Sequence, residues 1–200
     1  MSSGFGVGAA DAAKSDVLAL WQETFRGAPE AVREPVRALV ERSAGEVIER
    51  FYEHMLTHAR AQDYLKIDLV ESRLKATLHD WMVSLFSVRD EAMLPGLVAR
   101  QVQIGLVHAR IKLPSDLMQC GVRLIAAELR ARLPAFFPDM EMRLAAVVYI
   151  QEVLQVADML VTSAFVRNIQ DHARKEEAYR VVSLEHDMAL ERERQRAALA

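Results

Sequence analysis

The chain has 200 residues, with 25 Lys and Arg against 28 Asp and Glu, so its formal net charge is −3. That balance argues against a nucleic-acid binder, which normally carries a basic excess or stripe. A hydrophobic content of 52% excludes a chain disordered throughout, and 8 Gly and 6 Pro give little turn chemistry for a β-sandwich or barrel. The single cysteine, Cys120, excludes an intrachain disulfide and a cysteine-based zinc site.

The N-terminus lacks the marks of a signal peptide, because it combines no basic start with a continuous apolar run. The longest apolar run, Leu144–Ile150, is stopped by Gln151, whereas a bilayer span needs roughly 20 apolar residues. We therefore expect a soluble, cytoplasmic protein that binds neither membrane nor nucleic acid. Residues 1–14, with the glycine-rich stretch Gly4–Gly8, are expected to form a flexible terminus.

Helical periodicity is the only repeating pattern, because apolar side chains recur at spacings of three and four and no segment alternates with period two. The pattern predicts helices over Ser15–Phe25, Glu30–Arg42, Ser43–His58, Leu69–Val88, Pro95–Ile111, Pro114–Leu133 and Asp139 to about Ala197. Ser15 is expected to cap the first helix, and Pro114, Pro134 and Pro138 to separate the last three. The chain is therefore predicted to be all-α, with seven or eight helices and no strand.

The last predicted helix is apolar on more than one side between Met142 and Phe165. One side is expected to pack on the body of the domain and the other on a second copy of the chain, because a helix apolar on most of its circumference is normally buried. A polar change in this segment, such as Leu160→Glu, is expected to give monomers.

The tail after Ile169 is dense in charges of both signs. It keeps a sparse apolar seam at Val181, Leu184 and Met188. Two interpretations fit this pattern: a solvated helical end, or a helix that leaves the domain, pairs with its own copy and leads on to a further segment.

Among the histidines, His54 and His58 are four residues apart and form a candidate metal pair, but no third ligand is evident, and surface histidines explain them as well. His108 differs, because it lies on a mostly apolar stripe with Leu97, Gln101, Ile104 and Ile111. Such a residue is either a core histidine satisfied by a backbone carbonyl or an axial ligand of haem. The flat apolar ring of haem needs one imidazole and many aliphatic contacts.

Two hydroxyl residues would complete a haem pocket. Tyr52 shares the apolar side of its helix with Ile48 and Met55, and Thr77 lies on one face of the next helix with Leu74. The alternatives are a boundary tyrosine with its hydroxyl in water and a threonine bonded to its own helix. The sequence has no phosphate-binding glycine loop, GxSxG or HExxH motif, so we expect no catalytic site in this chain.

Three segments resemble those of globin-coupled sensors. The stretch Ile104–Pro114 (IGLVHARIKLP) resembles their proximal-histidine segment, Phe51 and Tyr52 resemble their distal tyrosine pair, and Arg73–Leu78 resembles their distal helix. The resemblance covers the chain from about Val17 onward.

The tail extends the resemblance. Lys175–Leu184 and Glu191–Gln195 are similar to the start of the linker in the branch that ends in a GGDEF diguanylate cyclase, which makes cyclic di-GMP. The chain contains no GGDEF signature, so it is not itself the cyclase.

The resemblance implies a globin fold with an extra N-terminal helix and a long C-terminal helix that serves dimerisation. It implies a sensor domain over residues 15–169 and a helical linker over 170–200 toward an output domain. The expected cofactor is haem b (iron protoporphyrin IX), with dioxygen, carbon monoxide and nitric oxide as ligands. A shift of Leu97–Ile111 on ligand binding is expected to tilt the last two helices and move the tail.

Residue roles follow from the same resemblance. His108 would be the proximal iron ligand, with its other ring nitrogen donating to a backbone carbonyl. Tyr52 would donate a hydrogen bond to dioxygen, and Leu74 would limit the access of water. Thr77 occupies a distal position that varies in the family between hydroxyl residues and alanine. The remaining expected haem contacts are Phe51, Leu97 and Ile104.

Two other functions compete with a haem-based dioxygen sensor. One is a cofactor-free, all-helical dimerisation or interaction module in which His108 and Tyr52 are core residues. The other is a haem protein with a redox role, such as nitric oxide dioxygenation, which is disfavoured because the sequence contains no flavin motif or reductase segment.

Overall fold

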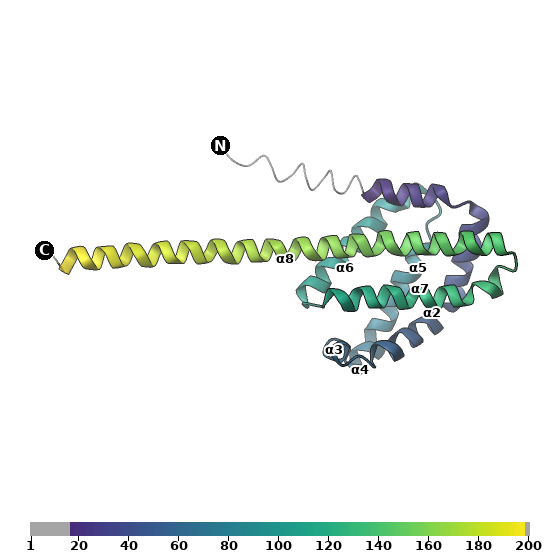
Figure 1. Ribbon diagram of the computed structural model, residues 1–200, viewed down its shortest axis with the longest axis horizontal. Helices are drawn as coiled ribbons and strands as arrows, with labels where there is room; N and C mark the ends of the chain where they lie inside the picture. Colours follow the sequence, from purple (N-terminus) through teal and green to yellow (C-terminus); the bar gives the residue numbers. More distant parts are fainter. Residues whose placement is uncertain (1–16, 199–200) are drawn as a thin grey trace.

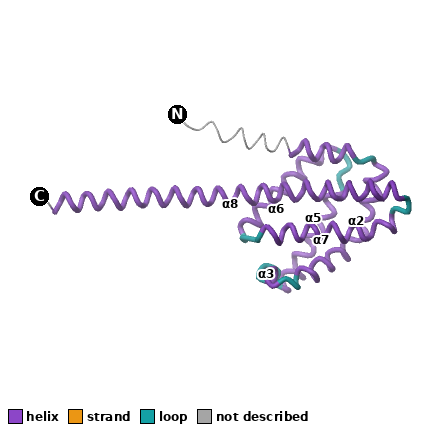
Figure 2. Tube along the Cα trace, in the orientation of Figure 1, coloured by secondary structure: helices purple, strands orange, loops and turns teal. Residues whose placement is uncertain are grey.

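A computed structural model describes residues 17–198 and contains helices joined by short loops, with no strand in that range (Figures 1 and 2). Ser15, the glycine-rich stretch and the rest of residues 1–14 lie outside the described residues. A first helix spans residues 17–27, and it is followed by α2 (Glu30–Met55), α3 (Ala59–Gln62), α4 (Ile67–Leu69), the π-helical turn η1 (Val70–Leu74), α5 (Lys75–Phe86), the 3₁₀ turn η2 (Glu91–Met93), α6 (Leu94–Arg110), α7 (Ser115–Phe136) and α8 (Met140–Ala198). The all-α prediction is confirmed.

Several boundaries differ from the sequence prediction, among them the expected helix Leu69–Val88, which is divided into α4, η1 and α5. The segments expected over Glu30–Arg42 and Ser43–His58 form the single helix α2. Ser43 does not cap a new helix, because it is buried and its hydroxyl donates to the carbonyl of Leu39, one turn earlier, at 2.6 Å. Pro134 does not end α7, which continues to Phe136. Its missing N–H costs only one backbone bond in the last turn.

The core is built around α2 and α8. Helix α2 packs on α5 and α7, and the first half of α8 packs on α6 and α7. In α8, Ala146, Ile150, Leu154 and Ala157 are almost fully buried. Leu160 is 5% exposed and belongs to the same core. The placement of Leu160 in a seam that faces a second copy is therefore wrong, and Leu160→Glu would bury a charge inside the domain.

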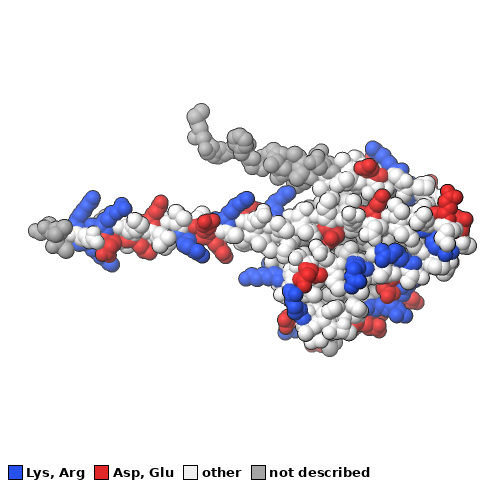
Figure 3. All heavy atoms as spheres, in the orientation of Figure 1, with Lys and Arg blue, Asp and Glu red and all other residues white. Residues whose placement is uncertain are grey.

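Beyond the domain, α8 continues as one straight helix (Figure 1). All of its described side chains from Ile169 onward are exposed, and Figure 3 shows acidic and basic side chains interspersed along this extension. The tail is thus a helix that leaves the domain, and what covers its apolar seam stays a prediction.

One described helix, α8, contains a stretch that is long and apolar enough to cross a membrane. Half of that stretch is buried inside the domain, as in the core helix of a soluble protein.

Candidate functional site

His108 lies in the last turn of α6, and its backbone is fixed by the end of that helix. Leu113 N–H donates to the carbonyl of His108 at 3.0 Å, and Lys112 N–H donates to the carbonyl of Ala109 at 3.0 Å. Lys112 adopts the left-handed conformation, with φ of 54°. This pattern is a Schellman motif, which usually places glycine at the left-handed position. The turn therefore holds the His108 segment in one orientation despite the strain at Lys112.

His108 is half-buried and is one of three described residues with a buried side-chain nitrogen that lacks a hydrogen-bond partner, the others being Trp21 and Arg33. In His108 this nitrogen is Nδ1. The backbone-carbonyl bond expected from the sequence is therefore not formed at this atom. Burial lowers the pKa of His108 from its ordinary value, which keeps the ring neutral at pH 7. A buried, unpaired nitrogen costs about 1–3 kcal/mol, so a neutral ring left in this state fits a ligand to a metal better than a satisfied core histidine.

Tyr52 projects from α2 into the apolar core and is 6% exposed. The ring of Phe51 meets it edge-on, with ring centroids 4.9 Å apart. Burial raises the pKa of Tyr52 to about 12, with the charge of Lys75 acting in the opposite direction. No described residue forms a hydrogen bond with its hydroxyl. The hydroxyl is thus protonated at pH 7 and free to donate.

One apolar cluster joins most of the residues expected around the haem. Tyr52 and Leu97 are buried in it, and Phe51, Leu74 and Ile104 pack against it. These residues come from α2, η1 and α6, which are distant in sequence. Ile104 also contacts the small cluster that contains Ala109, the neighbour of His108. The structure therefore brings five of the seven expected residues into one core, with His108 one turn beyond Ile104.

Thr77 is not part of that cluster. It is exposed on α5, and its hydroxyl donates to the carbonyl of Arg73 at 3.0 Å. This is the bond to its own helix that the sequence left as the alternative.

A polar pair that the sequence did not single out links α5 to α6. The indole N–H of Trp81 donates to Oε1 of Gln101 at 2.8 Å, and Gln101 is fully buried. The position of Gln101 on an apolar stripe was the only sequence feature that pointed to this pair. Its partner Trp81 is 20 residues away, and periodicity does not identify it. The bond ties the helix of His108 to the helix that follows Leu74.

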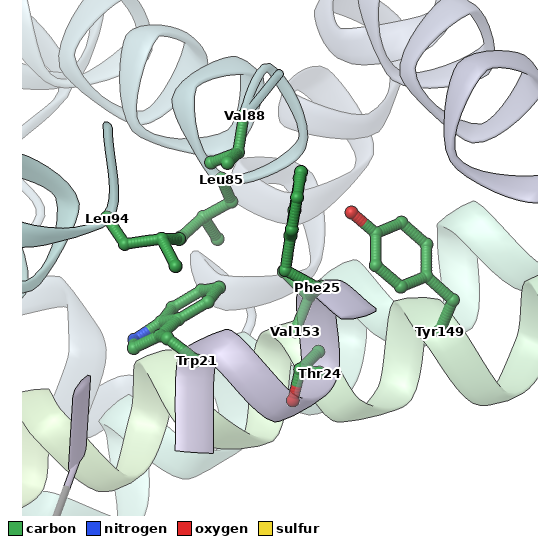
Figure 4. A pocket seen from close by; sticks show the side chains of 8 residues that line it. All are labelled: Trp21, Thr24, Phe25, Leu85, Val88, Leu94, Tyr149 and Val153. Carbon is green, nitrogen blue, oxygen red and sulfur yellow. The ribbon is translucent and has the colours of Figure 1, made fainter. Parts of the chain in front are cut away.

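Two hollows of the described structure lie near the elements discussed above. A cavity of about 10 Å³, room for one water, lies between the first helix, α5 and α8, and is lined by Trp21, Thr24, Phe25, Leu85, Val88, Leu94, Tyr149 and Val153 (Figure 4). A surface hollow of about 330 Å³ is lined by Arg50, Phe51, Glu53, His54, Leu124 and Glu128. Neither of these hollows is lined by His108, and the candidate site is defined by the environment of His108 and the surrounding cluster.

His54 and His58 are exposed, with ring centroids 5.3 Å apart. Among the described residues, no group of three or more His, Cys, Asp or Glu side chains is placed to hold a metal ion.

The helix order and the long exiting helix are similar to those of globin domains in solved structures. The globin domain of Escherichia coli DosC superposes in its ferrous form with a TM-score of 0.67 at 19% identity, covering 75% of this chain and 97% of that domain. The globin domain of a Geobacter sulfurreducens globin-coupled sensor gives 0.62 at 21% identity, covering 76% and 96%. The predicted globin fold is confirmed.

The sequence comparisons give the family. The Protoglobin family model matches residues 30–183, and the chain belongs to this family. Diguanylate cyclase DosC of Shigella flexneri is 24% identical over 149 residues, which are 74% of this chain and 39% of that protein. DosC of Escherichia coli strain K12 is also 24% identical over 149 residues, which are 32% of its length. The chain thus spans between 32% and 39% of the length of these relatives.

Proposed function

We propose that this chain is a haem-binding, dioxygen-sensing domain that regulates a covalently attached output, with a diguanylate cyclase as that output. The observation that carries the proposal is the half-buried imidazole of His108 in a protoglobin-family domain, with its Nδ1 buried without a partner and its pKa lowered by burial. The relatives with similar sequences are named diguanylate cyclases, which supports a diguanylate cyclase as the attached output. The helix that leaves the domain gives the output a point of attachment.

Haem b would supply an iron that binds a diatomic gas, whether dioxygen, carbon monoxide or nitric oxide. His108 would hold the cofactor from α6, and burial prepares it by keeping a ring nitrogen unprotonated. Tyr52 would donate its hydroxyl to dioxygen, which carries more negative charge than carbon monoxide and gains more from a donor. The high pKa of Tyr52 keeps that proton in place at pH 7.

The apolar side chains around these two groups would exclude water. Leu74 and Phe51 would cover the side of Tyr52, and Leu97 and Ile104 would contact the macrocycle from α6. Thr77 would serve at most as a second donor, since its hydroxyl is already engaged by Arg73.

We also propose that the chain forms a homodimer through α8. Between Met140 and Ile169, the large apolar side chains of α8 that remain exposed have relative exposures between 38% and 69% and lie within about 100° of arc, at about 100° per residue. They are Met140, Leu144, Val148, Met159, Val166 and Ile169. The buried residues of α8 occupy the opposite side, so a twin helix would cover the exposed stripe.

This arrangement divides the chain where burial ends. Residues 15–169 would be the sensor domain and 170–200 the linker, with the apolar seam of the linker paired in the dimer. We place the protein in the cytoplasm, where a domain of this kind meets both dissolved gas and a nucleotide-converting output.

An absorption spectrum of the purified chain tests the proposal. We expect a Soret band with one haem per chain, and a shift of that band when carbon monoxide is added to the reduced protein. A chain that folds fully and dimerises but takes up no haem would instead be a cofactor-free dimerisation module.

A further inference from the structure

Gly105 lies inside α6, one turn before His108, and it is buried. A glycine inside a helix is destabilising unless something requires it. Its backbone needs no left-handed conformation, because no glycine among the described residues has a positive φ. The requirement is space: a Cβ at this position would overlap the carbonyl oxygen of Val161 and lie 2.8 Å from Cβ of Ala164 and 3.2 Å from the amide nitrogen of Phe165.

The backbone of α6 therefore rests directly on the backbone of α8. The other glycine of α6, Gly96, has nothing within 4 Å of its Cβ position. Side-chain contacts can absorb a small helix shift by changing rotamers, whereas backbone atoms in contact must move together.

The contact is embedded in a small apolar cluster of Ala109, Met118, Val161 and Phe165, against which Ile104 and Leu113 pack. Leu113 also holds the carbonyl of His108. The last turn of α6 and residues 161–165 of α8 thus form one packed unit that includes the backbone of His108.

On the α8 side, this unit lies at the exit from the domain. Phe165 is the last buried residue of α8, and every described side chain beyond it is exposed or half-buried. A displacement applied at 161–165 would act at the base of the free extension, where a small tilt becomes a larger movement at its far end.

We propose that the contact of Gly105 with residues 161–165 is the point through which movement of the His108 helix reaches the exiting part of α8. The inference rests on the proposed function, because it takes ligand binding at His108 as the source of the movement. It adds which atoms of the two helices transmit that movement and predicts that one added methyl group changes the coupling.

Hydrogen exchange of the full, haem-loaded chain tests this proposal, with reduced protein measured with and without carbon monoxide. We expect carbon monoxide to change amide exchange in residues 158–170 of the wild type. The same change is expected in Gly96→Ala, which is the matched control for Gly105→Ala. In Gly105→Ala that ligand-dependent difference should be lost, while carbon monoxide still shifts the Soret band. An unchanged difference in Gly105→Ala, or no difference in the wild type, would overturn the inference.

Two further variants with smaller structural changes test the inference if Gly105→Ala does not fold. Ala164→Gly removes the methyl group that faces Gly105, and Ser163→Gly makes the same backbone change on the exposed side of the same turn. The ligand-dependent exchange difference should shrink in Ala164→Gly and persist in Ser163→Gly, and equal behaviour of the two would contradict the inference. A wild type without a Soret band would refute the proposed function itself, which is a distinct outcome.

Discussion

At the scale of single residues, the site rests on two side chains that carry polar groups on apolar helix faces, the imidazole of His108 and the phenol of Tyr52. Nδ1 of His108 is buried with no hydrogen-bond partner among the described residues, and Tyr52 is 6% exposed. Both groups are held in the form that a gas-binding haem site requires, a neutral imidazole and a protonated phenol. Burial is the cause in both cases.

Tyr52→Phe should leave carbon monoxide binding nearly unchanged and accelerate the release of dioxygen. A hydrogen bond to a partly charged ligand is worth roughly 1.5–3 kcal/mol, which corresponds to a rate about tenfold higher or more. Stopped-flow measurement of dioxygen dissociation gives the answer. If the rate matches that of the wild type, Tyr52 is not the donor.

Thr77→Val should have a smaller effect on dioxygen release than Tyr52→Phe. The hydroxyl of Thr77 is exposed and already donates to the carbonyl of Arg73, so little of it is available to a ligand. The same stopped-flow assay compares the two variants. A larger effect for Thr77→Val would reverse the assigned roles.

His108 should make the haem-free chain sensitive to acid. Above its unfolded pKa of about 6.5 the ring is neutral in both states and contributes no pH dependence. As the pH falls below that value, the unfolded chain takes up a proton that the folded chain resists, because burial lowers the folded pKa. As the pH falls below about 6.5, the free energy of unfolding of the wild type should therefore decrease relative to that of His108→Leu. Urea titrations at pH 7.5 and 5.5 measure this difference, and a constant difference would show that the ring is not buried as described.

At the scale of the helices, the sequence predicted which segments are helical more accurately than it predicted where each helix begins and ends. The apolar spacing in α6 gave its extent to within one residue at each end. The sequence prediction divided α2 at Ser43, whereas the serine is buried inside one continuous helix and its hydroxyl donates to the carbonyl of Leu39. The π-helical turn Val70–Leu74 has no sequence signature that periodicity can detect.

Some features of the candidate site could be predicted from the sequence, and others could not. The resemblance named His108 and Tyr52, and the structure places Phe51, Leu74, Leu97 and Ile104 in one cluster with Tyr52. The hydrogen bond between Trp81 and Gln101 and the close contact of Gly105 with α8 could not be predicted, because both depend on how α6 lies against other helices.

The end of α6 should tolerate one change that stabilises it. Lys112→Gly removes the side chain from a left-handed residue, and such a conformation costs L-residues roughly 1–2 kcal/mol. Because glycine also gains freedom in the unfolded chain, we expect a net stabilisation of about 0.5–1 kcal/mol in urea unfolding. A destabilised variant would mean that the exposed lysine side chain contributes more than the backbone strain removes.

At the scale of the whole molecule, the proposed dimer would connect the sensor domain to the proposed output. Leu144→Glu places a charge in the exposed stripe of α8, where Leu144 is 63% exposed and makes no core contact. Sedimentation at micromolar concentration should show a wild-type dimer and a monomeric Leu144→Glu with an intact haem spectrum. Ser163→Glu, which lies on α8 outside the stripe, is the control and should stay dimeric. A monomeric wild type would remove the dimer from the account.

The central claim is that His108 holds the haem, and haem titration of two variants tests it most directly. The wild type and His79→Ala should each bind one haem per chain with the same Soret maximum, because His79 is half-exposed on α5 and outside the cluster. His108→Ala should lose haem or bind it weakly with an altered spectrum. Full occupancy of His108→Ala with the wild-type spectrum would contradict the claim.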